Sequence, residues 1–303
     1  MQQPLVSVIV PNYNHAAFLK ERMDSIFNQS YSNYEVIILD DHSTDTSLEI
    51  IKEYAGQPKV SQIVSNDVNS SSPFMQWQRG LSLAKGEIIW IAESDDYCEP
   101  TMLERLVNVY VRNHCVLAFA RSQVVNFRGE KKYISQRMFK KDGHWDGVRF
   151  IRKYLTVGNR IYNASSCIFS RQAALKADKD FMQYKECGDW IFWIEIACQG
   201  NVAVVSDPLN YFRRGDDTCT SKATLSGQVD MEDYSVMSFL RSRDYLSRYA
   251  WFIKCKRMAY RVCYEKSRYA DISVKHRVMD RWNLPSFYYV LAKCSYAFHR
   301  LFK

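Results

Sequence analysis

The first 120 residues alternate between short apolar runs and segments in which apolar residues recur at helical spacing. Three runs are rich in β-branched residues and are predicted to be buried strands, at residues 6–10, 35–39 and 87–92. A shorter strand is expected at 61–65. Strands that alternate with helices predict an α/β protein built on a doubly wound, mostly parallel sheet.

The helices of this half carry boundary signals. Thr46 and Glu49 have the spacing of a capping box, which predicts that a helix begins there. Pro100 stands where the first residue of a further helix is expected.

The pattern after residue 115 is less regular. The remaining expected elements are strands at 116–120, 124–127, 165–169 and 202–205, and a helix at 190–198. From about residue 229 the pattern is helical throughout. We therefore expect two parts: a domain at 1–225 that contains the sheet, and a basic, aromatic helical region at 226–303.

Three of the predicted strands run directly into polar clusters. The clusters are residues 11–14 (Pro-Asn-Tyr-Asn), 40–45 (Asp-Asp-His-Ser-Thr-Asp) and 93–96 (Glu-Ser-Asp-Asp). The carboxyl ends of parallel strands meet at one edge of a sheet, where ligands of such folds bind. The sequence therefore predicts an acidic crevice. The alternative is that Asp40, Asp41 and Asp45 serve only turns and helix caps, and that 93–96 is a solvated loop.

Carboxylates that gather in one place repel each other unless a cation compensates their charge. A divalent cation, Mn²⁺ or Mg²⁺, is the expected cofactor, because it takes oxygen ligands and leaves positions open for phosphate oxygens. Neither a GxGxxG nor a GxxxxGK[ST] motif is present. The phosphates of a ligand would therefore be bound by the metal and by side chains.

Two later clusters add candidate residues. Glu186, Asp189 and Trp190 stand at a predicted helix start, where an apolar wall would raise the pKa of Asp189 and suit it to general-base chemistry. The alternative is that Asp189 merely caps the helix. Arg213 and Arg214 follow a strand and fit a diphosphate clamp, or else form an ordinary surface pair.

Charge is distributed unevenly along the chain. Residues 241–303 carry 15 Lys or Arg and 4 Asp or Glu, a net charge of +11, whereas the whole chain of 303 residues carries +8. The same segment holds 14 aromatic residues. It is either a solvated helical subdomain with an aromatic core or a surface that contacts an anionic membrane. No familiar nucleic-acid motif is present, so no nucleic acid partner is expected.

The last segment has one apolar helical face, which predicts either a docked or an interfacial helix. Its members are Phe287, Val290, Leu291, Cys294, Ala297, Phe298 and Leu301. No apolar run approaches the roughly 18 residues of a membrane span, and the start lacks a signal-peptide pattern. The nine cysteines contain no CxxC pair. We expect a cytoplasmic protein, with peripheral contact to the inner face of the cytoplasmic membrane.

The strings VSVIVPNYN, EVIILDDHSTD and AKGEIIWIAESDD, in this order and spacing, resemble glycosyltransferase family 2. Residues 74–80 (FMQWQRG) and 188–190 (GDW) resemble its bacterial surface-polysaccharide branch. The resemblance covers about residues 4–221. It implies a Rossmann-like GT-A fold and inverting transfer of a sugar from a nucleotide-sugar donor, commonly UDP-linked, to a hydroxyl of a growing, lipid-linked cell-surface glycan.

The resemblance also implies roles for individual residues. Asp96 matches the metal ligand of the DxD motif, and Asp189 matches the catalytic base. The diphosphate and the acceptor would be contacted by Glu186, Trp190, Arg213 and Arg214. The nucleotide would be bound by Pro11, Tyr13, Asn14, Asp40, Asp41 and Asp95.

Two positions depart from the family pattern. Glu93 stands where the DxD segment often begins with Asp, and Gly215 stands where His often follows the two arginines. Asp216 or Asp217 would then complete the metal shell.

Two other functions stay open as alternatives. One is a sugar nucleotidyltransferase, although the glycine-rich basic loop after the first strand is missing, and the other is a catalytically degenerate scaffold for glycan assembly.

Overall fold

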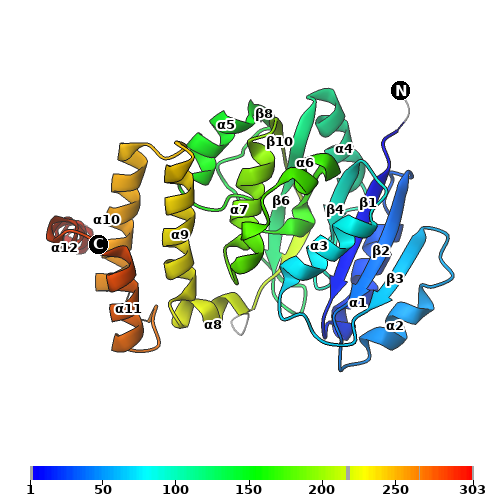
Figure 1. The fold of residues 1–303 in the computed structure, drawn as a ribbon, viewed down its shortest axis with the longest axis horizontal. Helices are drawn as coiled ribbons and strands as arrows, with labels where there is room; N and C mark the ends of the chain where they lie inside the picture. The colour runs from blue at the N-terminus through cyan, green and yellow to red at the C-terminus, as the bar shows by residue number, and fades with distance from the viewer. Residues whose placement is uncertain (1–2, 216–218, 266, 302–303) are drawn as a thin grey trace.

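The structure is a computed structural model that describes residues 3–215, 219–265 and 267–301. Its centre is one sheet with the strand order β3-β2-β1-β4-β9-β6-β10-β5, with β7 beside β6 and β8 beside β10 (Figure 1). The strands are β1 Val6–Asn12, β2 Tyr34–Asp40, β3 Val60–Ser65, β4 Ile88–Ile91, β5 Tyr97–Cys98, β6 Cys115–Val125, β7 Lys131–Ile134, β8 Gly143–Asp146, β9 Cys167–Ser170 and β10 Asn201–Arg213.

The first four strands form the parallel half that the sequence predicts. β1 pairs in parallel with β2 and β4, and β2 pairs in parallel with β3. Every residue of β1, β2 and β4 is buried, because both faces of the sheet are covered by helices. The carboxyl ends of these strands therefore lie together at one edge.

The other half of the sheet is mixed. β6 pairs in parallel with β10, whereas β9 lies antiparallel between β4 and β6. The two strands expected at 116–120 and 124–127 are one continuous strand, β6. The polar residues in the middle of β6 do not interrupt the strand, because their hydrogen-bonding groups have partners nearby. Ser135 Oγ accepts from the backbone N–H of Ser122, and the side chain of Arg121 donates to the carbonyls of Ser135 and Ser206.

The strand expected at 202–205 is also longer than predicted, since β10 runs on to Arg213. The register shifts on both sides of Pro208, where a bulge accommodates the missing N–H.

Two layers of helices cover the sheet. Helices α3 (Pro73–Leu83), α6 (Arg171–Lys176) and α7 (Gly188–Ala197) contribute to one apolar core. Helices α1 (Ala16–Phe27), α2 (Ser47–Glu53) and α4 (Met102–Arg112) contribute to the core on the opposite face. The shorter helical segments are α5 Gly147–Phe150, η1 Ile151–Leu155, η2 Ala164–Ser166 and η3 Lys179–Gln183.

Two predicted helix starts are corrected. The side chain of Thr46 makes no capping hydrogen bond; Asp45 does this work instead, accepting from the backbone N–H groups of Ser47 and Ala16. Asp45 thus also ties the start of α1 to the start of α2. The helix expected from Pro100 begins two residues later, at Met102.

The C-terminal helices are α8 (Cys219–Leu225), α9 (Gln228–Ser242), α10 (Arg248–Tyr264), α11 (Ile272–Trp282) and α12 (Ser286–Leu301). In Figure 1, α9 lies between α7 and α10, and α12 lies at the far end of the molecule. The predicted domain boundary at 225/226 falls between α8 and α9. Val236, Met237 and Leu240 of α9 belong to the same apolar core as α7, so the helical region shares its core with the sheet domain.

Helix α12 packs by a face other than its predicted apolar face, so the docked alternative is wrong for that face and the interfacial alternative stays a prediction. Tyr288 and Ala292 are buried, whereas Phe287, Val290 and Phe298 stay 45%, 60% and 61% exposed. The reason is that α10 presents aromatic partners to Tyr288 and Tyr296, such as Phe252 and Tyr264.

Two sequence expectations concern the environment of the chain. Within residues 3–215, 219–265 and 267–301, no helix is long and apolar enough to cross a membrane. Free thiols are found at Cys98, Cys115, Cys167, Cys187, Cys198, Cys255, Cys263 and Cys294.

If the helical region and the sheet domain share one core, Leu240→Ala should destabilise both together. We expect the free energy of unfolding to fall by roughly 2–5 kcal/mol, as for buried Leu→Ala changes in general. The matched control is Leu225→Ala, at a side chain 44% exposed. Urea titrations followed by fluorescence and circular dichroism measure both variants. Two separate transitions in the Leu240 variant would contradict a shared core.

Candidate active site

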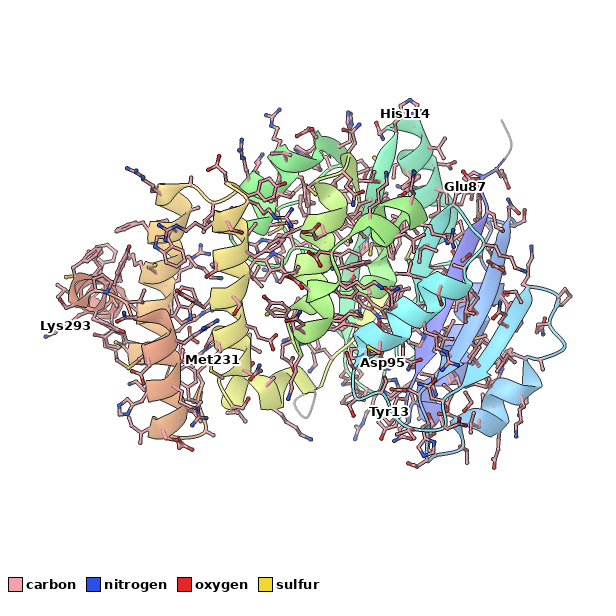
Figure 2. All side chains as sticks on the ribbon, viewed as in Figure 1. Tyr13, Glu87, Asp95, His114, Met231 and Lys293 are labelled. Carbon is pink, nitrogen blue, oxygen red and sulfur yellow. The ribbon has the colours of Figure 1, made fainter. Side chains whose placement is uncertain are left out.

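The three polar clusters meet at the carboxyl edge of the parallel strands. Figure 2 shows Tyr13 and Asp95 at this edge, whereas Glu87 and His114 lie at the opposite one. The first cluster is joined to the second by Asn12, whose Nδ2 donates to Asp40 Oδ1 over 2.9 Å. It is joined to the third by His15, whose Nδ1 lies 2.8 Å from Ser94 Oγ. The predicted convergence is therefore confirmed.

Asp40 and Asp41 are buried at this edge, and both oxygens of each carboxylate accept hydrogen bonds from the protein. Asp40 accepts from Asn12 and from the backbone and hydroxyl of Ser43. Asp41 accepts from the backbone and hydroxyl of Ser70 and from Gln76 Nε2 at 2.7 Å. Both carboxylates thus shape the loops at the edge, as the turn alternative anticipated. Their contact with a nucleotide stays a prediction.

The other predicted nucleotide contacts differ in exposure. Pro11 is buried within β1, whereas the ring of Tyr13 is 46% exposed. Asn14 adopts a left-handed conformation with φ of 55°. Its side chain accepts from the backbone N–H of Thr44 over 2.7 Å, which links the first two clusters.

The FMQWQRG string on α3 has a structural explanation. Gln76 binds Asp41 of the second cluster, and Trp77 Nε1 donates to Glu93 Oε1 of the third over 2.9 Å. A Cβ at Gly80 would overlap the side chain of Ile9 in β1, so glycine lets the helix approach the sheet closely. One helix therefore holds two acidic clusters in place.

The third cluster concentrates negative charge in a buried space. Asp96 is fully buried, and its Oδ2 accepts from Asn163 Nδ2 and Ser165 Oγ, each at 2.7 Å. Burial, together with the neighbouring Asp95, raises the pKa of Asp96 to about 6. The same two causes raise the pKa of Glu93 to about 8. Asp95 is only partly buried.

Two arginines compensate this charge. Arg22 on α1, fully buried, donates from Nε to the carbonyl of Glu93 over 2.8 Å. Arg213 donates to the carbonyl of Asp95 over 2.6 Å and forms an ion pair with Glu21 at 2.5 Å. The guanidinium of Arg213 thus supports the acidic segment, while Arg214 is exposed. The contact of Arg213 and Arg214 with a diphosphate remains a prediction.

The carboxylates that could hold a divalent cation here are partly engaged by the protein: Asp96 Oδ1 accepts from the backbone N–H of Arg213 over 3.0 Å, and Oδ2 accepts from two side chains. In the described part of the chain, no three His, Cys, Asp or Glu side chains are grouped to hold a metal. Mg²⁺ sites commonly use one or two carboxylates and complete their shell with phosphate oxygens. Asp95 and Asp96 are the two carboxylates available for that pattern, and Asp96 would exchange part of its present hydrogen bonds for the cation, so a metal at this place stays a prediction.

Gly215 stands at the position where the resemblance would place a histidine. A Cβ at Gly215 would overlap the ring of Phe127, which stacks on Phe18 at 6.0 Å. A histidine at 215 would require that aromatic pair to move. Asp216 and Asp217, the expected substitutes, lie outside the described residues.

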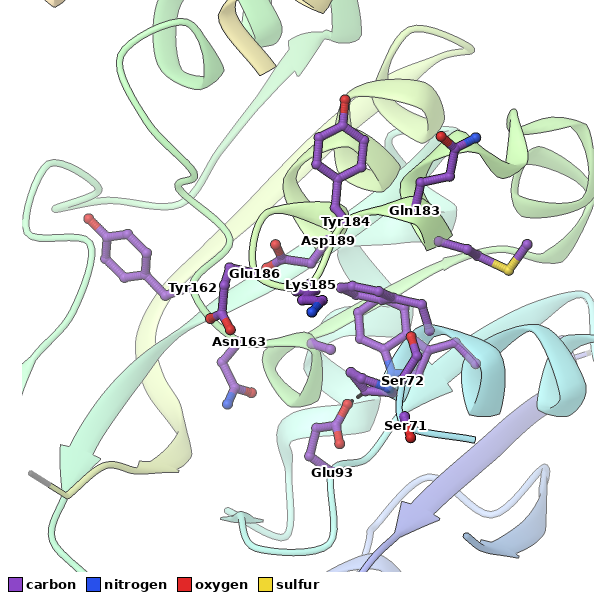
Figure 3. A pocket seen from close by; sticks show the side chains of 15 residues that line it. Ser71, Ser72, Glu93, Tyr162, Asn163, Gln183, Tyr184, Lys185, Glu186 and Asp189 are labelled. Carbon is purple, nitrogen blue, oxygen red and sulfur yellow. Dashed lines mark hydrogen bonds between the residues drawn. The ribbon is translucent and has the colours of Figure 1, made fainter. Parts of the chain in front are cut away.

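A pocket of about 700 Å³ adjoins the acidic cluster, a size that suits a small-molecule ligand. Figure 3 shows Glu93 and Ser71 on one side of it, and Glu186 and Asp189 on the other. Its lining residues are Ser71, Ser72, Pro73, Phe74, Trp77, Glu93, Tyr162, Asn163, Ala164, Met182, Gln183, Tyr184, Lys185, Glu186 and Asp189.

Asp189 lies at the start of α7 with the environment of a base. Its carboxylate accepts from Asn159 Nδ2 and from the backbone N–H of Trp190, each at 2.7 Å. Burial raises the pKa of Asp189 to about 7. Trp190 does not line the pocket: its ring is buried, and its Nε1 donates to the carbonyl of Leu155. The ring of Trp190 therefore belongs to the apolar core next to the pocket, and its contact with an acceptor stays a prediction.

Sequence reasoning missed the segment 159–166, which supplies Asn159 to Asp189, and Asn163 and Ser165 to Asp96. The reason is topological. A parallel sheet directs attention to the carboxyl ends of its strands, but β9 is antiparallel to β4, so the residues that precede β9 lie at this edge. The polar run NRIYNASS before the strand was the available signal.

Comparisons with known proteins agree with this geometry. The family model described as Glycosyl transferase family 2 matches residues 7–177. TarS, a poly(ribitol-phosphate) beta-N-acetylglucosaminyltransferase of Staphylococcus aureus, is 29% identical over 245 residues, which are 77% of this chain and 39% of TarS. A poly(ribitol-phosphate) beta-glucosyltransferase of Bacillus spizizenii is 32% identical over 138 residues, 45% of this chain and 21% of that protein. The chain spans less than two thirds of the length of these relatives.

Two solved structures show a similar fold. The crystal structure of Staphylococcus aureus TarS 1–349 in complex with UDP-GlcNAc has a TM-score of 0.61 at 22% identity, covering 93% of this chain and 72% of that one. The mannosyltransferase PcManGT from Pyrobaculum calidifontis, in complex with GDP-Man and Mn²⁺, has a TM-score of 0.57 at 15% identity, covering 98% and 75%. The likeness confirms the expected GT-A type α/β fold with its helical C-terminal region.

The Asn159 contact makes a prediction about Asp189. A hydrogen bond to the charged carboxylate lowers its pKa, so Asn159→Leu should move the pKa of Asp189 further above 7. The pH dependence of the side-chain carboxyl carbon signal in NMR measures this, with Asp189→Asn to assign the signal. An unchanged or lower pKa would contradict the role given to Asn159.

Proposed function

The chain belongs to glycosyl transferase family 2, and on that premise we propose that it moves a sugar from a nucleoside diphosphate sugar to a hydroxyl group of a growing cell-surface glycan, with inversion at the anomeric carbon. The observation that carries this proposal is the placement of Asp189. Its carboxylate has a pKa of about 7 and lines a pocket that also borders the Glu93–Asp96 cluster.

In this proposal the donor lies along the carboxyl edge of the sheet. Its base stacks near Tyr13, whose ring is exposed, within the loops that Asn14, Asp40 and Asp41 shape. Its diphosphate lies beside Asp95 and Asp96, and its sugar extends into the pocket. A UDP-sugar is the first donor to test, because the similar TarS structure contains UDP-GlcNAc.

The proposed chemistry is one displacement. The acceptor hydroxyl gives its proton to Asp189, and its oxygen bonds to the anomeric carbon as the bond from that carbon to the diphosphate oxygen breaks. Attack from the face opposite the leaving group inverts the configuration. A pKa near the working pH lets Asp189 both accept the proton and release it afterwards.

The leaving group is a diphosphate whose negative charge must be balanced. Asp96 and Asp95 would hold a divalent cation, Mn²⁺ or Mg²⁺, which supplies positive charge to the departing oxygens. Arg214 is exposed at the same end of β10 and can approach the diphosphate. Arg213 keeps the backbone of the acidic segment in position through the carbonyl of Asp95.

The acceptor belongs to the same proposal. The relatives are described as acting on poly(ribitol-phosphate), which supports a surface polymer with free hydroxyl groups as acceptor. Such polymers are commonly assembled on a lipid carrier, and we propose a lipid-linked acceptor and a cytoplasmic protein that contacts the inner face of the cytoplasmic membrane.

A donor panel tests the chemistry. Purified protein should hydrolyse one member of a set of UDP-, GDP- and dTDP-sugars slowly, in the presence of Mn²⁺ or Mg²⁺. Asp189→Asn should lower turnover at least about 100-fold while leaving donor binding intact. Asp96→Ala and chelator should each abolish the metal-dependent rate. Nucleotide release measures turnover, and equal rates in wild type and the Asp189 variant would refute the proposal.

The proposed membrane contact is assigned to α12. Its exposed side carries Phe287, Val290 and Phe298, with Lys293 between them on the outer surface of the molecule (Figure 2). Exposed apolar side chains on a helix flanked by basic residues are typical of helices that lie in the surface of an anionic membrane.

Vesicle binding tests this contact, with circular dichroism to show that each variant keeps its helices. Phe287→Ser combined with Phe298→Ser should reduce binding to vesicles of anionic lipid about tenfold or more. Truncation from about residue 280 is a poorer test, because it removes Trp282, whose ring is buried. Tyr249→Ser, at a ring 74% exposed on α10, is the control. Sedimentation with vesicles gives the result, and unchanged binding of the double variant would refute the contact.

A further inference from the structure

The helical region reaches into the proposed active site through one side chain. Glu232, on the first turns of α9, is 6% exposed and points at the loop that precedes α7. Its Oε1 accepts from the backbone N–H of Lys185 at 2.9 Å, and its Oε2 accepts from those of Glu186 at 2.9 Å and Cys187 at 2.8 Å. Three consecutive backbone donors therefore converge on one carboxylate.

This loop forms a wall of the pocket. Lys185 and Glu186 line it, and Asp189 follows two residues after the last N–H that Glu232 holds. The N–H groups at a helix start carry partial positive charge, so a carboxylate placed there is stabilised and fixes the orientation of the helix entry. Gln228, one turn earlier on α9, donates to Glu232 Oε1 over 2.7 Å and orients the carboxylate in turn.

A second contact connects α9 with the base. Asp233 forms a buried ion pair with Lys254 of α10 at 2.7 Å. Lys254 Nζ lies 5.3 Å from the centre of the Trp190 ring, and Trp190 is the residue whose backbone N–H binds Asp189. The base is thus supported from two adjacent positions of one helix that lies outside the residues matched by the family model.

We infer that Glu232 is a positioning residue: it holds the loop at 185–187, and through it Asp189, in the geometry that proton transfer requires. The helical region is then a working part of the active site. This inference rests on the proposed function for its effect on turnover, whereas its effect on the loop is independent of that function.

The test is Glu232→Gln, which keeps the shape but places an amide N–H₂ against backbone donors. The matched control is Glu195→Gln. Glu195 lies near the other end of α7 and forms an ion pair at 3.0 Å with Arg243, which follows the last residue of α9. This carboxylate therefore also links the helical region to α7. A merely structural contribution would move both variants alike.

The first readout is amide hydrogen exchange, which needs no substrate. Exchange across Lys185, Glu186 and Cys187 should accelerate at least about tenfold in Glu232→Gln, because the amide offers one neutral acceptor oxygen where the carboxylate offers two charged ones, and should stay at the wild-type rate in Glu195→Gln. If Glu232→Gln fails to fold, Glu232→Asp takes its place for hydrogen exchange and turnover, because its carboxylate is withdrawn from the loop by one methylene. This variant keeps the negative charge and therefore does not enter the titration of Asp189.

The second readout is the titration of Asp189. The charged groups that face it are Glu186 and Glu232, and both raise its pKa in addition to burial. The thiols of Cys167 and Cys187 are also near, and burial raises their pKa values, so they stay neutral. Removing the charge of Glu232 should shift the titration of Asp189 to lower pH, whereas Glu195→Gln should leave it unchanged.

The third readout is turnover of the sugar nucleotide found in the donor panel. Glu232→Gln should lower kcat about tenfold or more with the KM for donor within twofold, since the donor's nucleotide lies at the other edge of the pocket. Wild-type exchange at 185–187 and an unmoved Asp189 titration in Glu232→Gln would overturn the inference. Loss of loop protection without any wild-type turnover on the panel would instead refute the proposed function alone.

Discussion

The active-site region depends on three carboxyl groups that lie close together at the edge of the sheet, one of them fully buried and two partly buried. Glu93, Asp95 and Asp96 follow a strand that is covered on both faces, so their backbone cannot move away from the repulsion. Neutral donors take up part of the charge: Asn163 and Ser165 bind Asp96, and Trp77 binds Glu93. The pKa values of Glu93 and Asp96 nevertheless stay raised, to about 8 and about 6. A divalent cation at this place would lower them.

The same constraint explains why both buried arginines of the edge are attached to backbone. Arg22 and Arg213 donate to the carbonyls of Glu93 and Asp95, and thereby fix the acidic segment while their charge lowers the cost of burying it. The two arginines thus hold the backbone of the acidic segment in place. The groups that face the pocket are held by a further layer, in which Asn159 orients Asp189 and Glu232 orients the loop before it. The residues that support the proposed chemistry therefore come from elements between α1 and α9.

Much of this could be predicted from the sequence, because strands buried on both faces read as continuous apolar runs and parallel strands place their carboxyl ends together. The convergence of the clusters at 11–14, 40–45 and 93–96 follows from those two facts. The antiparallel β9 could not be anticipated, since a four-residue strand carries no sign of its direction, and with it Asn159, Asn163 and Ser165 were missed. The packed face of α12 was likewise set by the aromatic side chains of α10 and not by the helix's own pattern.

The sequence by itself determined the fold class, the acidic edge and the identity of Asp189 as candidate base, since these depend on local periodicity and on residue type at strand and helix ends. Tertiary structure alone decided which polar groups are already engaged. The sequence predicts that Asp40, Asp41, Asp96 and Arg213 contact a ligand, yet in the structure these side chains form hydrogen bonds mainly with other groups of the protein. Glu232 reads as one acidic residue of a helix, yet it binds three backbone N–H groups 45 to 47 residues away. Partners so distant in the chain are chosen by packing, because a buried polar group takes whichever donor the fold brings within reach.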